Sequence, residues 1–287
     1  MENILSVKNL SKSYKGFTLN NISFNVPKGY IMGLIGPNGA GKSTTIKLIM
    51  NLVKRNSGSI NIFGLDNIKH EREIKQRIGF VYDENYFYDD LNLIEMKNII
   101  KRFYKNWDDE VFNKYMTDFK LPLKKNIKQL SKGMKMKYSL GIALSHNAEL
   151  IIMDEPTSGL DPVFRSEMLD ILYSLIQDEN KAILFSTHIT TDLEKIADYI
   201  TFLNSGEIVF SDTKDSILET YKIIKGDKNL LTSDIKDYLI GITENSFGFE
   251  GLTNNVEAIR KLTKNDVLVE NATLDDIIVF TVKGGKH

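Results

Sequence analysis

The chain has 287 residues, enough for one large domain or two modest ones, and its 42% hydrophobic and 26% charged residues are typical of a folded globular protein. Its 37 basic and 38 acidic residues give a formal net charge of −1, which argues against a general nucleic-acid coat, and its lack of cysteine excludes disulfides, thiolate metal sites and cysteine nucleophiles. No apolar stretch approaches the roughly 18 residues of a membrane span and no signal peptide is recognisable, so we expect a cytoplasmic protein unless a partner holds it at a membrane.

Two segments near the N-terminus, residues 4–10 and 17–26, alternate apolar and polar side chains and predict an antiparallel pair of strands. Tyr14 is expected in the polar turn between them. An aromatic ring at that position is either part of the core or placed to stack on a nucleotide base, and the spacing alone does not decide between the two.

Residues 36–44 read GPNGAGKST and lie between the apolar run of residues 30–35 and a helical pattern at residues 46–50. This strand, glycine-rich loop and helix form the P-loop pattern, in which backbone N–H groups surround phosphate oxygens at a helix N-terminus. An ordinary turn with three glycines is the alternative. The expected phosphate-binding residues are Gly36, Pro37, Asn38, Gly39, Ala40, Gly41, Lys42, Ser43 and Thr44, with Lys42 on the terminal phosphates and Ser43 on Mg²⁺.

Residues 57–64 and 77–81 are predicted strands, and residues 92–119 contain two apolar stripes at helical spacing. We interpret these stripes as core, with a groove for a partner helix as the alternative. Pro122 is expected to end this helical region.

Residues 130–134, LSKGM, open another predicted helix. Ser131 and Gly133 form either a plain N-cap or an anion site, since exposed N–H groups, the helix dipole and a hydroxyl converge there.

The apolar run of residues 150–153 ends in Asp154 and Glu155 and is typical of a central strand in a parallel sheet. Ligand chemistry in such sheets collects at the carboxyl ends of the strands. Asp154 would hold Mg²⁺ or its water and Glu155 would activate the water that attacks the γ-phosphate, although two acids before a proline also suit a simple turn.

A turn at residues 157–162, a helix at residues 163–178 and a buried strand at residues 182–186 follow, and His188 lies just beyond that strand. We expect His188 at the same sheet edge as Asp154, where it could donate to a γ-phosphate oxygen. Residues 200–203 and 207–210 predict a hairpin. After about residue 215 the nucleotide-binding patterns stop, and short amphipathic segments predict a small α/β appendage.

The P-loop, residues 130–134, Asp154-Glu155, the turn at residues 158–161 and His188 together resemble the ATP-binding subunit of ABC transporters, over about residues 4–216. The resemblance implies an ATP sandwich, in which two such subunits meet head to tail and each nucleotide lies between the P-loop of one and Ser131-Gly133 of the other. It also implies that Tyr14 stacks on adenine, that Asp161 belongs to a turn crossing the dimer interface and that His188 is the switch histidine.

Two elements depart from the family pattern, at three positions. Lys132 and Met134 replace a glycine and a glutamine of the usual Leu-Ser-Gly-Gly-Gln signature, and Asp83 stands where a glutamine is usual. Asp83 can still touch Mg²⁺ or its water. These departures are similar to those of single-domain bacterial subunits that pair with ABC-2-type export permeases, including exporters of bacitracin and antimicrobial peptides.

The resemblance therefore implies an α/β P-loop fold of the ABC type, with a mixed central sheet, an antiparallel β subdomain, a helical subdomain at about residues 84–146 and an accessory region at residues 217–287. The implied function is ATP hydrolysis that drives export through a separate membrane permease, with ATP and Mg²⁺ as ligands, a second ATP-binding subunit of the same or a related kind, and a position on the inner face of the membrane. A non-transport ABC ATPase, acting as a regulator or on ribosomes or DNA, is the alternative.

Overall fold

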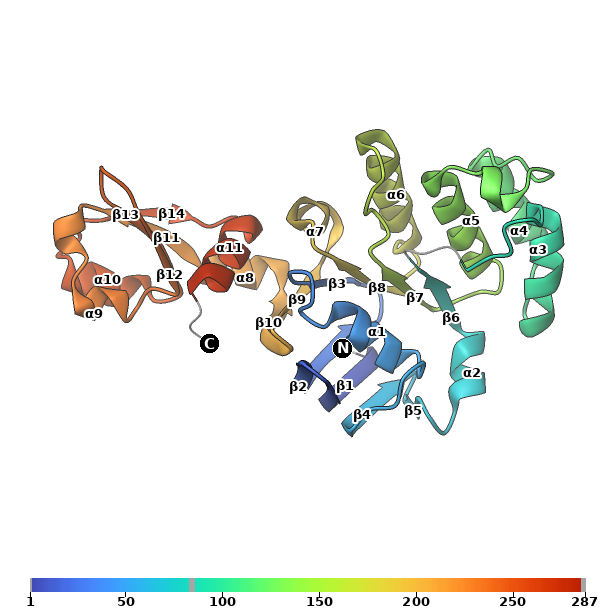
Figure 1. Cartoon of the computed structure of the whole chain (residues 1–287), viewed down its shortest axis with the longest axis horizontal. Helices are drawn as coiled ribbons and strands as arrows, with labels where there is room; N and C mark the ends of the chain where they lie inside the picture. Colours follow the sequence, from blue (N-terminus) through green and yellow to red (C-terminus); the bar gives the residue numbers. More distant parts are fainter. Residues whose placement is uncertain (1, 83–85, 285–287) are drawn as a thin grey trace. The chain divides into compact units, whose positions relative to one another are not determined.

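The computed structural model describes residues 2–82 and 86–284, and the chain divides into two compact units, Met1–Phe210 and Ser211–His287 (Figure 1). The boundary at residues 216 and 217 and the extent of the helical subdomain stay predictions. Within the described ranges, no helix is both long and apolar enough to cross a lipid bilayer.

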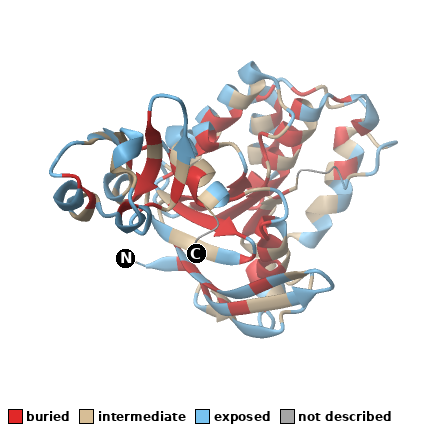
Figure 2. Cartoon of the chain, turned by 60° about the vertical axis from the view of Figure 1, so that its left-hand side comes forward, coloured by how far each residue is buried: buried red, intermediate tan, exposed pale blue. Residues whose placement is uncertain are grey.

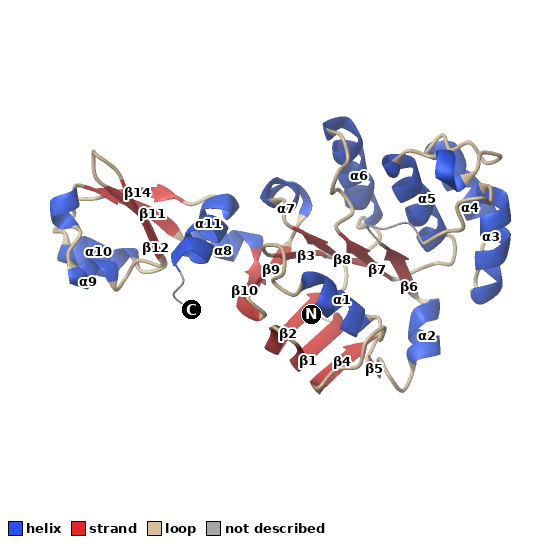
Figure 3. Ribbon diagram, viewed as in Figure 1, coloured by secondary structure: helices blue, strands red, loops and turns tan. Residues whose placement is uncertain are grey.

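A six-stranded sheet forms the centre of the first unit, in the order β10-β9-β3-β8-β7-β6 (Figure 3). Strands β3, β7 and β8 are buried along their whole length, because the sheet is covered on both faces (Figure 2). Neighbours from β9 to β6 pair in parallel. The strands are β3 (Ile31–Ile35), β6 (Ile78–Val81), β7 (Leu150–Asp154), β8 (Ala182–Thr187), β9 (Tyr199–Asn204) and β10 (Glu207–Thr213).

An antiparallel sheet, in the order β2-β1-β4-β5, forms the second layer. It comprises β1 (Asn3–Tyr14), β2 (Phe17–Pro27), β4 (Ser57–Ile62) and β5 (Leu65–Asp66). Helix α1 (Lys42–Ile49) lies between the two sheets, and one apolar core joins all three (Figure 3). The predicted pairing of the first two strands is confirmed, but the placement of Tyr14 in a turn is wrong. Tyr14 ends β1 and pairs with Phe17, because the register continues to the end of the hairpin.

The helical part of the first unit confirms two helices within residues 92–119, each begun by a side-chain cap. Asn92 and Glu95 form a capping box on α3, and Asp108 caps α4. The hydroxyl of Tyr138 donates to the Leu93 carbonyl at 2.9 Å and ties α5 to α3. The helices are α2 (Glu71–Gln76), α3 (Leu93–Ile100), η1 (Lys101–Phe103), α4 (Asp109–Asp118), η2 (Ile127–Gln129), α5 (Lys132–Leu144), α6 (Pro162–Leu175) and α7 (Thr190–Ile196).

The second unit is an α/β module around a sheet in the order β12-β13-β11-β14. Its core gathers Ile224, Ile235, Leu239, Phe249 and Ile259. The unit has its own hydrophobic cluster, as we expect of an appendage that folds around its own sheet. Its elements are α8 (Lys214–Thr220), β11 (Lys222–Gly226), η3 (Lys228–Leu230), α9 (Ser233–Lys236), β12 (Gly241–Glu244), β13 (Phe249–Thr253), α10 (Val256–Leu262), β14 (Leu268–Asn271) and α11 (Leu274–Gly284).

Candidate functional site

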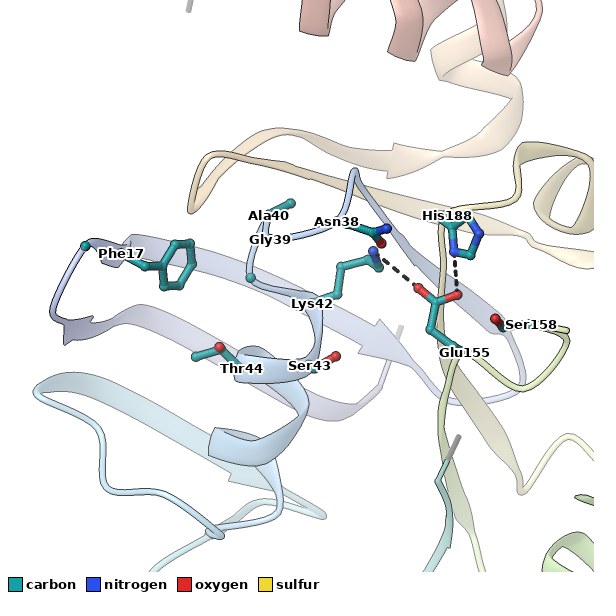
Figure 4. Close-up of a pocket in the computed structure, with 12 residues that line it drawn as sticks. Phe17, Asn38, Gly39, Ala40, Lys42, Ser43, Thr44, Glu155, Ser158 and His188 are labelled. Carbon is teal, nitrogen blue, oxygen red and sulfur yellow. Dashed lines mark hydrogen bonds and ion pairs between the residues drawn. The ribbon is translucent and has the colours of Figure 1, made fainter. Parts of the chain in front are cut away.

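A cavity of about 670 Å³ opens where β3, β7 and β8 end, above the N-terminus of α1 (Figure 4). Carboxyl ends of parallel strands and a helix N-terminus are both places where proteins bind phosphorylated ligands. The residues that line it are Gly16, Phe17, Asn38, Gly39, Ala40, Gly41, Lys42, Ser43, Thr44, Glu155, Ser158 and His188.

The glycine-rich loop between β3 and α1 has the backbone geometry that a phosphate cradle needs. A Cβ on Gly36 would lie 2.2 Å from the Leu203 carbonyl oxygen, so only glycine lets the loop start against β9. Gly39 has a φ of +82°, and a Cβ there would meet nothing within 4 Å. The loop therefore faces open space with its backbone uncovered, and this space accommodates a chain of phosphates.

Lys42 lies buried at the first position of α1, with 6% of its side chain exposed. Its ammonium donates to the Gly36 carbonyl at 2.8 Å and lies 3.3 Å from Oε1 of Glu155. A buried ammonium needs several acceptors, and these two hold the charge at the mouth of the phosphate cradle.

Ser43 and Asp154 bring two oxygen ligands together. The Ser43 hydroxyl donates to Oδ1 of Asp154 at 3.3 Å, and the buried Ser186 hydroxyl donates to the same oxygen at 2.5 Å. Among the described residues, no cluster of three or more His, Cys, Asp or Glu side chains could hold a metal. Mg²⁺ usually takes one or two protein oxygens together with phosphate oxygens and water, so this pair fits Mg²⁺ held partly by a nucleotide.

Glu155 is held in place through both its backbone and its side chain. Its φ of +49° is in the left-handed region, which costs a non-glycine residue about 1–3 kcal/mol. Its backbone N–H donates to the Ser186 carbonyl and hydroxyl oxygens, both at 3.1 Å. Both carboxylate oxygens face donors, since Oε1 lies 3.3 Å from Lys42 Nζ and Oε2 lies 2.8 Å from His188 Nδ1 (Figure 4).

His188 follows β8 directly, and 44% of its side chain is exposed. Its predicted position at the same sheet edge as Asp154 agrees with the structure, because β7 and β8 are parallel neighbours and end together. The cavity is thus lined by the Lys42 ammonium, the Ser43 hydroxyl, the Glu155 carboxylate and the His188 imidazole. Asp154 is not itself a lining residue, but its Oδ1 lies 3.3 Å from the Ser43 hydroxyl.

Several other residues predicted for the site lie apart from the cavity lining. Tyr14 is 45% exposed and has the Lys12 ammonium 5.0 Å from its ring centroid, while Phe17 and Gly16 of the same hairpin line the cavity. Asp83 lies outside the described residues. Stacking of Tyr14 on adenine and metal contact by Asp83 stay predictions.

Ser131 and Asp161 are helix caps. Ser131 accepts from the Met134 N–H at 3.3 Å at the start of α5, and Asp161 accepts from Val163 and Phe164 N–H groups at the start of α6. A Cβ on Gly133 would lie 2.6 Å from the Phe164 ring, so the two helix starts pack closely. Ser131, Gly133 and Asp161 are not among the residues that line the cavity.

The sequence predicts no functional role for Phe17 or Ser186, and it predicts Ser158 only as part of the turn at residues 158–161 that supports the family resemblance. Ser186 had a local signal, since a hydroxyl at the end of an apolar strand needs a buried partner. Phe17 reaches the cavity through the hairpin register, which local patterns do not determine, and Ser158 reaches it from the predicted turn after β7.

Comparison with known proteins gives consistent matches. A family model described as "ABC transporter" matches residues 19–158. The chain is 36% identical over 214 residues to the bacitracin transport ATP-binding protein BcrA of Bacillus licheniformis, covering 73% of this chain and 69% of that protein. It is 34% identical over 223 residues to the lantibiotic transport ATP-binding protein SrtF of Streptococcus pyogenes, covering 74% and 92%.

Solved structures agree. An ATP-binding subunit of an ABC transporter is 30% identical with a TM-score of 0.68, covering 75% of this chain and 92% of that one. A dimeric ATP-binding cassette bound to ADP and Pi is 22% identical with a TM-score of 0.65, covering 73% and 98%, and supports the fold alone.

Proposed function

The chain belongs to the family of ABC transporter ATP-binding proteins, and we propose that it uses ATP hydrolysis to drive export of a drug-, peptide- or lipid-like substrate through a separate membrane permease. The observation that carries the proposal is Glu155, held beside the phosphate cradle with Lys42 and His188 on its two oxygens. The names of the bacitracin and lantibiotic transport relatives support transport rather than a role on ribosomes or DNA, and the export direction is part of the proposal.

In this proposal the loop between β3 and α1 binds the phosphates through its backbone N–H groups, and Lys42 holds the terminal ones. Ser43 and Asp154 would hold Mg²⁺, which neutralises phosphate charge when bound. Ser186 keeps Asp154 in place through its 2.5 Å hydrogen bond, so the metal ligand does not have to be ordered during the reaction.

Glu155 would act on the attacking water. Both of its oxygens are occupied by donors that a γ-phosphate also attracts, namely the Lys42 ammonium and the His188 ring. We expect these donors to shift to the γ-phosphate when ATP binds, which frees Glu155 to orient the water and accept its proton. The ATP itself would thereby activate the base that hydrolyses it.

The site would be completed by a second ATP-binding subunit. Ser131 and Gly133 lie at the start of α5, where N–H groups and the helix dipole favour an anion, yet they lie outside the cavity of their own chain. In a head-to-tail pair, Ser131 and Gly133 would contact the nucleotide bound to the P-loop of the partner subunit. Asp161 would lie in the turn that crosses the interface between the two subunits.

The permease would dock on the helical part of the first unit. Exposed side chains there include Phe103, 71% exposed, with Ile99, Tyr86 and Tyr88. Exposed apolar and aromatic side chains of this kind are able to pack on the apolar face of a partner helix. This contact would hold the chain at the inner face of the membrane.

Glu155→Gln tests the proposal. The amide keeps the size of the side chain but cannot take a proton, so we expect intact ATP binding, turnover lowered by at least about 100-fold, and ATP-dependent pairing of chains. Nucleotide titration, phosphate release and sedimentation measure the three quantities. Wild-type turnover in this variant would contradict the role of Glu155, and a variant that stays monomeric with saturating ATP would contradict pairing between two copies of this chain.

A further inference from the structure

A buried carboxylate next to the site has no part in the mechanism above. Asp192 of α7 is 1% exposed. It accepts hydrogen bonds from the Thr157 hydroxyl and from Nε of Arg165, both at 2.6 Å. The other arm of Arg165 donates to the Thr191 hydroxyl at 2.6 Å, so Arg165 of α6 clasps two consecutive residues of α7.

This cluster joins the same two chain segments as the contact between Glu155 and His188. Thr157 follows Glu155 by two residues, and Asp192 follows His188 by four. Two side-chain contacts therefore connect the turn after β7 to the segment after β8. One tie is the partly exposed pair of Glu155 and His188 at 2.8 Å, and the other is the buried pair of Thr157 and Asp192 at 2.6 Å.

The two ties differ in permanence. Glu155 and His188 face the cavity, and ATP is expected to separate them. Thr157 and Asp192 are each 1% exposed, so their hydrogen bond is shielded from water and breaking it would leave a buried carboxylate short of a partner. The buried tie can hold the two segments in place while the exposed one opens.

Glu155 needs such support because its backbone is strained at a φ of +49°. A strained residue keeps its conformation only when its surroundings fix it. Before Glu155, Ser186 fixes the chain through the Glu155 N–H. After Glu155, the Thr157 hydroxyl bound to Asp192 provides the side-chain anchor.

We propose that Asp192 is a positioning residue for ATP hydrolysis, which acts through Thr157 and Arg165 to set the distance between Glu155 and the His188 segment. The inference rests on the roles proposed above for Glu155 and His188. It predicts that the cluster affects turnover more than nucleotide binding, because Asp192, Thr157 and Arg165 hydrogen-bond one another and none of the three lines the cavity.

The substitutions Thr157→Val and Thr157→Ser form the primary test. Valine keeps the shape and removes the hydroxyl, while serine keeps the hydroxyl and removes a methyl group. We expect Thr157→Val to lower kcat by about 10- to 100-fold with KM and nucleotide affinity within about twofold of wild type, since misplacement by about 1 Å costs that much. Thr157→Ser should stay within about threefold of wild-type kcat, because the anchor is retained.

Asp192→Asn is the second variant, combined with Thr157→Val in a double-mutant cycle. We expect the double variant to lose little more than either single one, because both remove the same anchor. Glu149→Gln is the control for stability, since it disrupts an ion pair at the other end of β7. Its Tm should fall while kcat stays at the wild-type value.

Wild-type kcat in both Thr157→Val and Asp192→Asn would overturn the inference, and if Glu155→Gln still stalls, the proposed function survives. Equal losses in Thr157→Val and Thr157→Ser, or losses of kcat that track Tm as in any destabilised variant, would overturn it as well. Wild-type turnover in Glu155→Gln would remove the premise and would overturn both.

Discussion

Strand β7 has a glutamate at each end, Glu149 directly before it and Glu155 directly after it. Glu149 accepts two hydrogen bonds from Arg77, at 2.6 and 2.8 Å, in a bidentate ion pair. Glu155 has a strained backbone, borders a cavity and meets Lys42 and His188 with one oxygen each. The same residue type therefore forms a bidentate ion pair at the amino end of β7 and, in our proposal, acts in ATP hydrolysis at its carboxyl end.

The difference follows from the parallel sheet. Its carboxyl edge receives the loops of β3, β7 and β8 together, so side chains distant in sequence converge there. At its amino edge, Glu149 forms an ion pair with Arg77, and the hydrogen bond from Arg77 lowers the pKa of Glu149. The ion pair of Glu149 stabilises the amino edge, whereas the strained backbone of Glu155 costs stability at the carboxyl edge, where we propose that ATP is hydrolysed.

The most direct test of this difference is the same substitution, glutamate to glutamine, at both ends of β7. Glu155→Gln should lower kcat by at least about 100-fold, whereas Glu149→Gln should leave kcat within about twofold of wild type. The free energy of unfolding should fall more in Glu149→Gln than in Glu155→Gln. We expect Glu149→Gln to lose about 1 kcal/mol, because it removes a partly exposed bidentate ion pair.

Chemical denaturation and steady-state phosphate release measure the two quantities. The stability contributed by the lowered pKa of Glu149 is present above its unfolded-state pKa and is lost as pH falls through the folded-state value. The difference between wild type and Glu149→Gln should accordingly shrink in acid. A large loss of kcat in Glu149→Gln would contradict the separation of the two ends.

A second prediction concerns His146, which lies three residues before Glu149. Its ring is 1% exposed and stacks on Tyr104 with centroids 3.8 Å apart, and its two nitrogens lack hydrogen-bond partners among the described residues. Burial lowers its pKa from 6.5 to about 4. The folded chain therefore keeps this ring neutral where the unfolded chain protonates it.

The sign of the effect is fixed by that shift. Well above pH 6.5 the ring is neutral in both states and contributes no pH dependence. As pH falls from 6.5 to about 4, only the unfolded chain takes up the proton, so stability should drop by about 3 kcal/mol. His146→Phe should flatten the fall in unfolding free energy over this range, while His70→Phe, at an exposed ring, should not. An unchanged slope in His146→Phe would contradict the prediction.

How far the sequence predicts the molecule depends on how local each signal is. Strands β3, β7 and β8 are predictable because each is a continuous apolar run, followed by the P-loop, by two acids and by a histidine respectively. Parallel pairing of these strands then brings Asp154, Glu155 and His188 to one edge of the sheet. Tyr14 was placed wrongly, since the end of a hairpin depends on register with the partner strand.

The buried cluster around Asp192 escaped prediction for a related reason. Thr157, Arg165 and Asp192 lie on three elements, and nothing in their local sequence marks them as partners. Helix α7 is only seven residues long and carries no strong periodic pattern, so the burial of Asp192 follows from packing rather than from propensity. Most strands of the second unit were missed likewise, because short strands of four or five residues give weak signals.

We propose that the P-loop cavity is half of a site, completed by Ser131 and Gly133 of a second ATP-binding subunit, and a mixture of two variants of this chain tests whether another copy can supply that half. Lys42→Met inactivates the P-loop half. Ser131→Asp inactivates the other half by placing a negative charge at the phosphate, and aspartate is itself a good N-cap, so α5 should remain folded.

Each variant alone should be inactive. Mixed in equal amounts, half of the pairs contain both variants and have one intact composite site, so ATPase activity should return to about one quarter of wild type. Steady-state phosphate release from the mixture is the direct measurement. Activity that stays at the sum of the two separate variants would contradict a site shared between two copies.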